Sequence, residues 1–152
     1  MARETGRAQR VTEGPRAGWL QWIEPVADTF LSLLGPIYLR PDGEGRAIVE
    51  LEPRSEHCNR VGTLHGGFIA GFADHALFSG LVAMGHEAMT ASVTIDLSIQ
   101  YMAAGRFGEP LRAEVELLGE TGRLLFMRMI LVQGDGPVAA AAGTLRKPSV
   151  AR

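Results

Sequence analysis

The chain has 152 residues, of which 46% are hydrophobic, and this is enough for one domain with a single sizeable core. Its 15 basic and 17 acidic residues leave a net charge of -2, and the isoelectric point is near 6.1. This balance argues against a nucleic-acid partner, because nucleic-acid-binding proteins usually carry a basic field or stripe. No stretch approaches the roughly 20 apolar residues that span a membrane, so no membrane partner is expected either.

The single cysteine, Cys58, excludes an internal disulfide and suits a reducing, cytoplasmic setting. No Cys and His spacing typical of a metal site occurs, so we expect no metal site. Residues 1–18 contain four arginines but no apolar core, which excludes a secretory signal and predicts a disordered segment ahead of one domain at 19–152. An organelle transit peptide is the alternative interpretation of this start.

The first predicted elements are a helix and a hairpin. Apolar residues recur near helical spacing over residues 19–34, where Pro25 is a candidate kink and Gly35 ends the pattern. Residues 37–40 and 47–51 flank a turn-forming segment, which predicts two paired strands.

A proline-free stretch, Gly66–Met84, is too long for a strand and is typical of a buried helix. Eight of its residues are glycine or alanine, and each interior glycine costs a helix about 1 kcal/mol. We therefore expect another part of the molecule to approach the backbone of this helix closely.

Residues 91–102 alternate strictly between apolar and polar, as in a long strand with one wet face. The apolar face is predicted to hold Val93, Ile95, Leu97, Ile99 and Tyr101, and the polar face Ser92, Thr94, Asp96, Ser98 and Gln100. Three further strands are predicted near residues 111–117, 123–133 and 138–146. Together these elements favour an α+β fold in which an antiparallel sheet wraps around one long central helix.

Asp74 is the only carboxylate between Glu56 and Glu87, and it lies in the apolar predicted helix. An ionised carboxylate is costly to bury without partners, so Asp74 is an acid at an exposed edge, a satisfied core aspartate, or a group kept for chemistry. We favour chemistry, because residues 59–67 form a flexible turn that leads into a helix N-terminus, where free backbone N–H groups favour negative charge.

Asn59, the run His65-Gly66-Gly67, Asp74 and the strand Val93–Met102 together resemble the PaaI-type acyl-CoA thioesterases of the hotdog-fold superfamily. The resemblance covers about residues 45–147. It implies a hotdog fold, an acyl-CoA substrate, and a homodimer or homotetramer in which two subunits pair their sheets. It also implies that the active sites lie at the dimer interface.

The resemblance implies catalytic roles for four residues. Asp74 would act as a nucleophile or as a general base for water, and the backbone N–H of Gly66 would hold the thioester carbonyl oxygen. Asn59 would position the water or the carbonyl, and Thr94 would orient the water, although Ser92 is a neighbour on the same face. For Gly66 and Asn59, an ordinary role as turn residues is the alternative.

Substrate-binding roles are expected for His65 and Gly67, which belong to the same turn, and the ring of His65 is expected to anchor that turn. Arg106, Arg146 and Lys147 are candidates for contacts with the phosphates of coenzyme A, and solvated surface charge is their alternative role.

His75 and Cys58 also lie near the predicted site. His75 is expected to pack or to face a subunit neighbour, because adjacent helix residues point about 100° apart. Cys58 is expected to be a small hydrophobic residue and not a nucleophile.

The sequence therefore predicts an acyl-CoA thioesterase that releases a free acid and coenzyme A without a metal or a redox cofactor. The alternatives are a hotdog hydratase or dehydratase, and a non-catalytic acyl-CoA-binding or sensor protein of the same fold. The acyl group stays open, because aromatic, short-chain and medium-chain groups are all compatible with Phe72, Phe78 and Met84.

Overall fold

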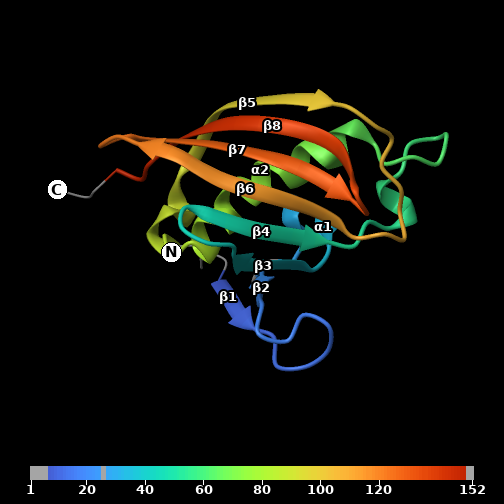
Figure 1. The fold of residues 1–152 in the computed structure, drawn as a ribbon, viewed down its shortest axis with the longest axis horizontal. Helices are drawn as coiled ribbons and strands as arrows, with labels where there is room; N and C mark the ends of the chain where they lie inside the picture. Colours follow the sequence, from blue (N-terminus) through green and yellow to red (C-terminus); the bar gives the residue numbers. More distant parts are fainter. Residues whose placement is uncertain (1–6, 25–26, 150–152) are drawn as a thin grey trace.

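The structure, a computed structural model, describes residues 7–24 and 27–149. Within these residues, one antiparallel sheet of eight strands wraps around one long helix (Figure 1). The strands are β1 (Arg7–Arg10), β2 (Leu20–Ile23), β3 (Ile37–Pro41), β4 (Arg46–Leu51), β5 (Val93–Tyr101), β6 (Leu111–Glu120), β7 (Leu124–Gln133) and β8 (Gly136–Arg146). Their order in the sheet is β1-β2-β3-β4-β6-β7-β8-β5.

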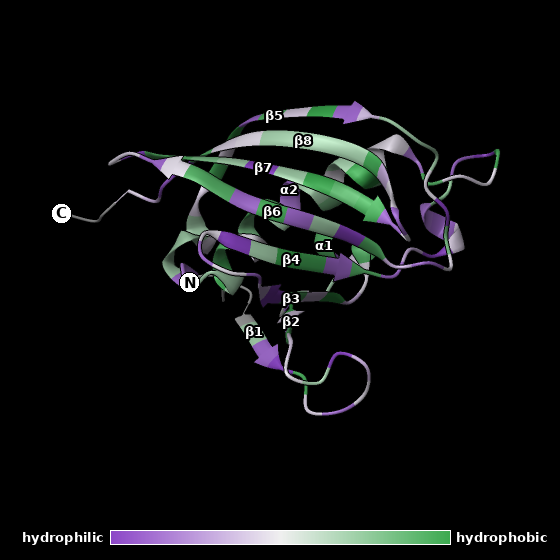
Figure 2. Cartoon of the chain, viewed as in Figure 1, coloured by the Kyte–Doolittle hydropathy of each residue, from purple (hydrophilic) through white to green (hydrophobic). Residues whose placement is uncertain are grey.

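The helices are α1 (Phe30–Leu34) and α2 (Gly66–Ala83), with short 3-10 turns at η1 (Ser55–His57) and η2 (Glu87–Ala91). This arrangement confirms the predicted α+β hotdog fold. The strands that flank the turn at residues 42–45 pair as predicted, with Leu39 opposite Val49. Figure 2 shows polar and apolar residues alternating along β6, because one face of the strand packs on the core and the other faces outward.

Helix α2 forms the centre of the core and is enclosed by the sheet. By length and composition alone it could also cross a membrane, a test that the buried core helix of a soluble protein passes as well; 61% of it is buried here. A Cβ atom on Gly143 of β8 would lie 2.6 Å from Cδ1 of Leu77, and one on Gly80 would lie 2.9 Å from Cγ1 of Val115. The predicted close approach to this helix is therefore confirmed.

Strand β5 lies at one edge of the sheet and contains a bulge between Thr94 and Asp96. The strict alternation predicted for this strand is therefore wrong at its start, because a bulge inserts one extra residue and shifts the faces that follow. Leu97 and Ile99 pack against the core, whereas Ile95 is 55% exposed. Thr94 lies on the helix side of the strand, where it hydrogen-bonds to α2.

The single helix predicted at residues 19–34 is wrong. Leu20, Gln21 and Trp22 instead pair with β3, and among the described residues of this range the α-helix is limited to Phe30–Leu34. Helical spacing of apolar residues is a weak local signal, and the unpaired edge of β3 offers backbone hydrogen bonds that outweigh it. The candidate kink at Pro25 lies outside the described residues.

The N-terminal residues differ from the expected disordered segment over residues 7–18. Strand β1 pairs with β2, and the loop between them is attached to the sheet by Arg16, which forms ion pairs with Glu50 and Glu52 at 2.7 and 2.9 Å. The Arg16 guanidinium also lies 4.4 Å from the centre of the Tyr38 ring. These contacts join residues far apart in sequence, so local composition does not reveal them. Residues 1–6 lie outside the described residues.

Gly143→Ala tests the close packing of the sheet on α2. The added methyl group collides with Leu77 in the core, so we expect the free energy of unfolding to fall by about 1–3 kcal/mol. Urea denaturation measures this change. Gly136→Ala in the same strand is the matched control, because its Cβ atom meets no heavy atom within 4 Å. Equal stability of the two variants would contradict the packing described.

Candidate active site

Asp74 lies on α2, half-buried, and faces a cavity of about 320 Å³. The hydroxyl of Thr94 donates a hydrogen bond to Oδ1 of Asp74 at 2.7 Å, and the bulge in β5 gives Thr94 this orientation. Among the described residues, no ion pair and no other hydrogen bond involves the carboxylate. The cavity is lined, besides Asp74, by Trp22, Phe30, Leu31, Gly71, His75, Phe78, Thr90 and Ser92. Asp74 is therefore a carboxylate held from one side and open to a cavity on the other.

The N-terminus of α2 leaves the backbone N–H of Gly66 free. The Gly66 N–H has no acceptor among the residues that the structure describes, while the Gly66 carbonyl accepts a hydrogen bond from the Tyr101 hydroxyl at 2.8 Å. The Gly67 N–H instead donates to Nδ1 of His65 at 2.9 Å. The ring of His65 thus caps the helix and anchors the turn, as its predicted role requires, but it also occupies the Gly67 amide.

Asn59 closes the turn that leads into α2. Its side-chain oxygen accepts hydrogen bonds from the backbone N–H groups of Val61 and Thr63 at 3.0 and 3.2 Å, and its amide nitrogen donates to the Thr63 hydroxyl at 2.8 Å. The turn-forming role is therefore present in the structure. The amide nitrogen carries two hydrogens and these contacts use one, so one donor is left for a ligand.

Gly66 and Asp74 lie on one continuous α-helix, eight residues apart. At 1.5 Å per residue this separates them by about 12 Å along the helix axis. A group that attacks a carbonyl carbon and a donor that holds its oxygen must both lie within about 3 Å of the same carbonyl. The Asp74 and Gly66 of one chain therefore cannot act on the same carbonyl in this conformation.

His75 is buried, with 5% of its surface exposed, and its ring packs edge-on against Trp22 of β2 at 4.9 Å between ring centres. The predicted packing role is therefore confirmed. Nε2 of His75 has no hydrogen-bond partner among the described residues. Burial lowers the pKa of His75 to about 4, so the ring is neutral near neutral pH.

The basic candidates lie outside the cavity lining. Lys147 forms an ion pair with Glu120 at 2.6 Å, and Arg106 forms one with Glu109 at 3.4 Å. Arg146 is exposed at the end of β8. In the isolated chain, the structure places none of these three residues against Asp74.

Two further observations concern Cys58 and metals. Cys58 packs against the core, with its sulfur 3.9 Å from the carbonyl oxygen of Arg54, as expected for a small hydrophobic residue. Over residues 7–24 and 27–149, no group of three or more His, Cys, Asp or Glu side chains could hold a metal ion.

Sequence reasoning missed three residues that form this site. Trp22 and Phe30 line the cavity, but both were assigned to one long helix. Tyr101 was placed in the strand motif without its role of holding the Gly66 carbonyl. The available signal for Tyr101 was its hydroxyl, because the hydroxyl of a tyrosine at the end of a strand usually forms a hydrogen bond.

Comparison with known proteins gives consistent matches. A profile of the thioesterase superfamily matches residues 61–140. A Pseudomonas aeruginosa protein named "Putative esterase PA0474" is 33% identical over 120 residues, which cover 78% of this chain and 87% of that protein. Human acyl-coenzyme A thioesterase 13 is 32% identical over 100 residues, which cover 66% of this chain and 70% of that protein.

Similar solved structures also belong to proteins of this kind. A mutant of the phenylacetic acid degradation protein PaaI from Thermus thermophilus is 26% identical with a TM-score of 0.66, and the match covers 80% of this chain and 100% of that one. With more than half of its length matched by the family profile, the chain belongs to the thioesterase superfamily and is a thioester hydrolase. Within that class, the resemblance to the PaaI-type proteins is confirmed.

The buried ring of His75 predicts a pH dependence of stability. Its pKa is lower in the folded chain, about 4, than the usual 6.5, so the unfolded chain binds more protons between these values. The contribution of His75 to stability is therefore lost as the pH falls from about 6.5 to about 4, by a total of about 3 kcal/mol.

His75→Leu is expected to remove this part of the pH dependence, as measured by urea denaturation across the same range. His86→Gln, at a half-buried histidine, is the control and should keep the dependence of the unchanged protein. Parallel stability curves for the unchanged protein and His75→Leu would show that burial of this ring does not govern the effect.

Proposed function

We propose that the protein hydrolyses acyl-CoA thioesters to a free acid and coenzyme A, with Asp74 as the acid residue that drives the reaction. The observation that carries the proposal is the Asp74 carboxylate, which is open to the cavity and oriented by Thr94 in a chain of the thioesterase superfamily. The name of the human relative, acyl-coenzyme A thioesterase 13, supports coenzyme A as the thiol.

Two routes are open to the carboxylate. As a general base, Asp74 takes a proton from water while the water oxygen attacks the thioester carbonyl carbon, and the C–S bond then breaks. As a nucleophile, a carboxylate oxygen attacks the same carbon and water hydrolyses the resulting anhydride. In both routes the sulfur leaves as a thiolate, a leaving group that needs little help because thiols have a pKa near 8.5. Thr94 fixes Oδ1, which leaves Oδ2 for the reacting partner.

The negative charge that develops on the carbonyl oxygen needs a donor, and the free N–H of Gly66 at the N-terminus of α2 suits this role. One such donor is typically worth about 3 kcal/mol of barrier. The remaining amide hydrogen of Asn59 is a second candidate donor in the same turn. Because His65 occupies the Gly67 amide, we assign Gly67 a part in the shape of the turn and no direct contact with the substrate.

The separation of about 12 Å between Gly66 and Asp74 along α2 supports a site built by two chains. In a homodimer with antiparallel α2 helices, Asp74 of one subunit would lie against Gly66 and Asn59 of the other. Strand β5 is suited to this pairing, because it lies at a sheet edge and exposes 45% of Val93 and 55% of Ile95.

Asp74→Asn tests the assignment of the acid. The substitution keeps the shape of the side chain but removes the negative charge and the proton acceptor, so we expect turnover to fall at least about 100-fold while the protein stays folded. Release of free thiol from a panel of acyl-CoA substrates measures the rate. Asp135→Asn, at an exposed carboxylate in the turn between β7 and β8, is the control and should keep its activity. Near-normal turnover by folded Asp74→Asn protein would refute the role of Asp74.

Co-refolding of two inactive variants tests the shared site. Asp74→Ala and Gly66→Val proteins, unfolded and refolded together, form mixed dimers in which one of two interface sites has every original group. Random pairing makes about half of the dimers mixed, so about a quarter of the original sites should regain activity. A mixture that stays inactive, although native mass measurement finds mixed dimers, would place the acid and the donor in one chain.

A further inference from the structure

Phe30 lies on α1, directly over the surface of α2 next to Asp74. A Cβ atom on Gly71 would lie 2.5 Å from Cζ of the Phe30 ring, so the ring occupies the space that a side chain at this position would fill. Gly71 and Asp74 are three residues apart on the helix and share one face. The ring of Phe30 therefore lies within one helical turn of the carboxylate and lines the same cavity.

The position of Phe30 is not explained by burial in the core, because 58% of the residue is exposed. Large apolar side chains that stay exposed beside a cavity commonly belong to a binding surface. The other large apolar side chains lining this cavity are Trp22, Leu31 and Phe78. Phe30 and Leu31 are both presented by the short helix α1, so their positions depend on how α1 is held.

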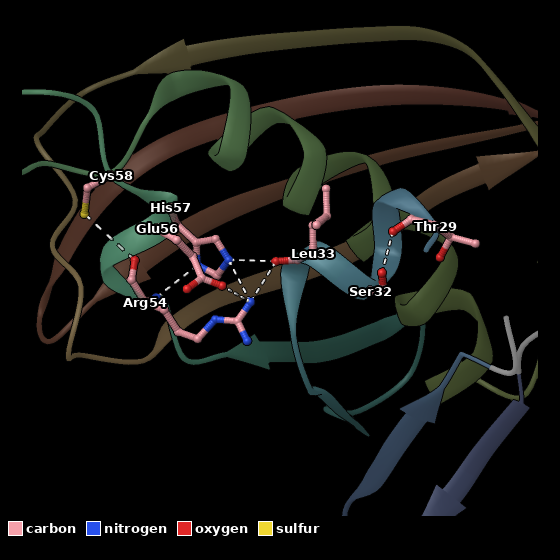
Figure 3. A network of polar contacts seen from close by, with 7 residues as sticks. All are labelled: Thr29, Ser32, Leu33, Arg54, Glu56, His57 and Cys58. Carbon is pink, nitrogen blue, oxygen red and sulfur yellow. Dashed lines mark hydrogen bonds and ion pairs between the residues drawn. The ribbon is translucent and has the colours of Figure 1, made fainter. Parts of the chain in front are cut away.

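Arg54 and His57 hold the end of α1 (Figure 3). Nδ1 of His57 accepts a hydrogen bond from the Arg54 backbone N–H at 3.0 Å, so the ring hydrogen lies on Nε2. Nε2 then donates to the carbonyl oxygen of Leu33 at 2.8 Å, and the Arg54 guanidinium donates to the same oxygen at 3.1 Å. The ring of His57 is itself fixed, because it stacks on Phe68 of α2 at 4.1 Å between ring centres.

These contacts matter because α1 has only five residues, too few to be stable as an isolated helix. At its other end, the Ser32 hydroxyl donates to the Thr29 carbonyl at 2.7 Å. Helix α1 is thus attached to α2 through the His57 ring and the Leu33 carbonyl. Phe30 lies three residues, about one helical turn, before Leu33.

We propose that Phe30 determines which acyl groups the protein accepts: its ring forms one wall of the acyl-binding cavity beside Asp74, and His57 is a positioning residue that holds this wall in place through α1. The inference rests on the proposed hydrolysis of acyl-CoA. The cavity of about 320 Å³ is open to the surface on one side and has mainly apolar walls, which suits an acyl group packed against the Phe30 ring. Removal of the Phe30 ring would extend the pocket over Gly71 and so favour longer acyl chains.

The test compares kcat/KM for butyryl-CoA, octanoyl-CoA and palmitoyl-CoA in the unchanged protein and in Phe30→Ala. We expect Phe30→Ala to raise the ratio of palmitoyl-CoA to butyryl-CoA at least about tenfold, because an apolar wall discriminates between acyl groups by about this factor. Leu33→Ala is the matched control, since Leu33 is on the same helix, is 62% exposed and does not line the cavity. Its ratio should equal that of the unchanged protein.

His57→Phe tests the positioning role. Phenylalanine keeps a ring to stack on Phe68 but removes the hydrogen bond to the Leu33 carbonyl. We expect the palmitoyl-to-butyryl ratio to rise, by less than in Phe30→Ala, and we expect no further rise when His57→Phe is combined with Phe30→Ala. A purely structural role for His57 would lower all three rates together and leave the ratio unchanged, which would refute the positioning role.

Different results would refute the selection of acyl groups by Phe30 and the hydrolysis of acyl-CoA. If the unchanged protein hydrolyses butyryl-CoA or octanoyl-CoA but Phe30→Ala and Leu33→Ala give the same ratio, Phe30 does not select the acyl group and the hydrolytic function stands. If the folded, unchanged protein releases no thiol from any of the three substrates, the proposed function fails and the role of Phe30 fails with it. Should Phe30→Ala not fold, Phe30→Leu makes a smaller opening and should raise the ratio in the same direction.

Discussion

Helix α2 lies very close to the sheet. A methyl group on Gly80 of the helix would collide with Val115, and one on Gly143 of β8 would collide with Leu77. Close packing of this kind excludes water from most of the helix, and polar groups are costly there. Asp74 is tolerated because it lies where the enclosure ends, beside the edge strand β5 and the cavity. The tight enclosure of α2 thus restricts a carboxylate to the part of the helix that the sheet does not cover.

Elements with strong local signals were predictable from the sequence. Helix α2 was recognised by its length without proline, and β3 and β4 by the turn between them, because these signals lie within the elements themselves. Asp74 stood out as a candidate because a lone carboxylate in an apolar helix is costly, and its catalytic role stays a prediction. The ring of His65 was expected to anchor the turn, and the hydrogen bond that its Nδ1 accepts from the Gly67 amide agrees.

Features that depend on distant partners were not predictable. The apolar spacing of residues 20–22 predicts a helix, but these residues pair with β3. The loop after β1 is held by the ion pair of Arg16 with Glu50. The orientation of Thr94 depends on a bulge that arises only where β5 meets β8. The wall formed by Phe30 was hidden for the same reason, because α1 is placed by Arg54 and His57 from another part of the chain.

The bulge in β5 also bears on the solubility of the molecule. An exposed edge strand offers unpaired N–H and C=O groups to any other strand, and long flat edges invite uncontrolled addition of chains. A bulge twists the edge and interrupts its regular ladder. Because the bulge lies near the start of β5, the regular stretch is confined to Asp96–Tyr101, six residues at most. The feature that turns Thr94 toward Asp74 therefore also limits open-ended β-aggregation at this edge.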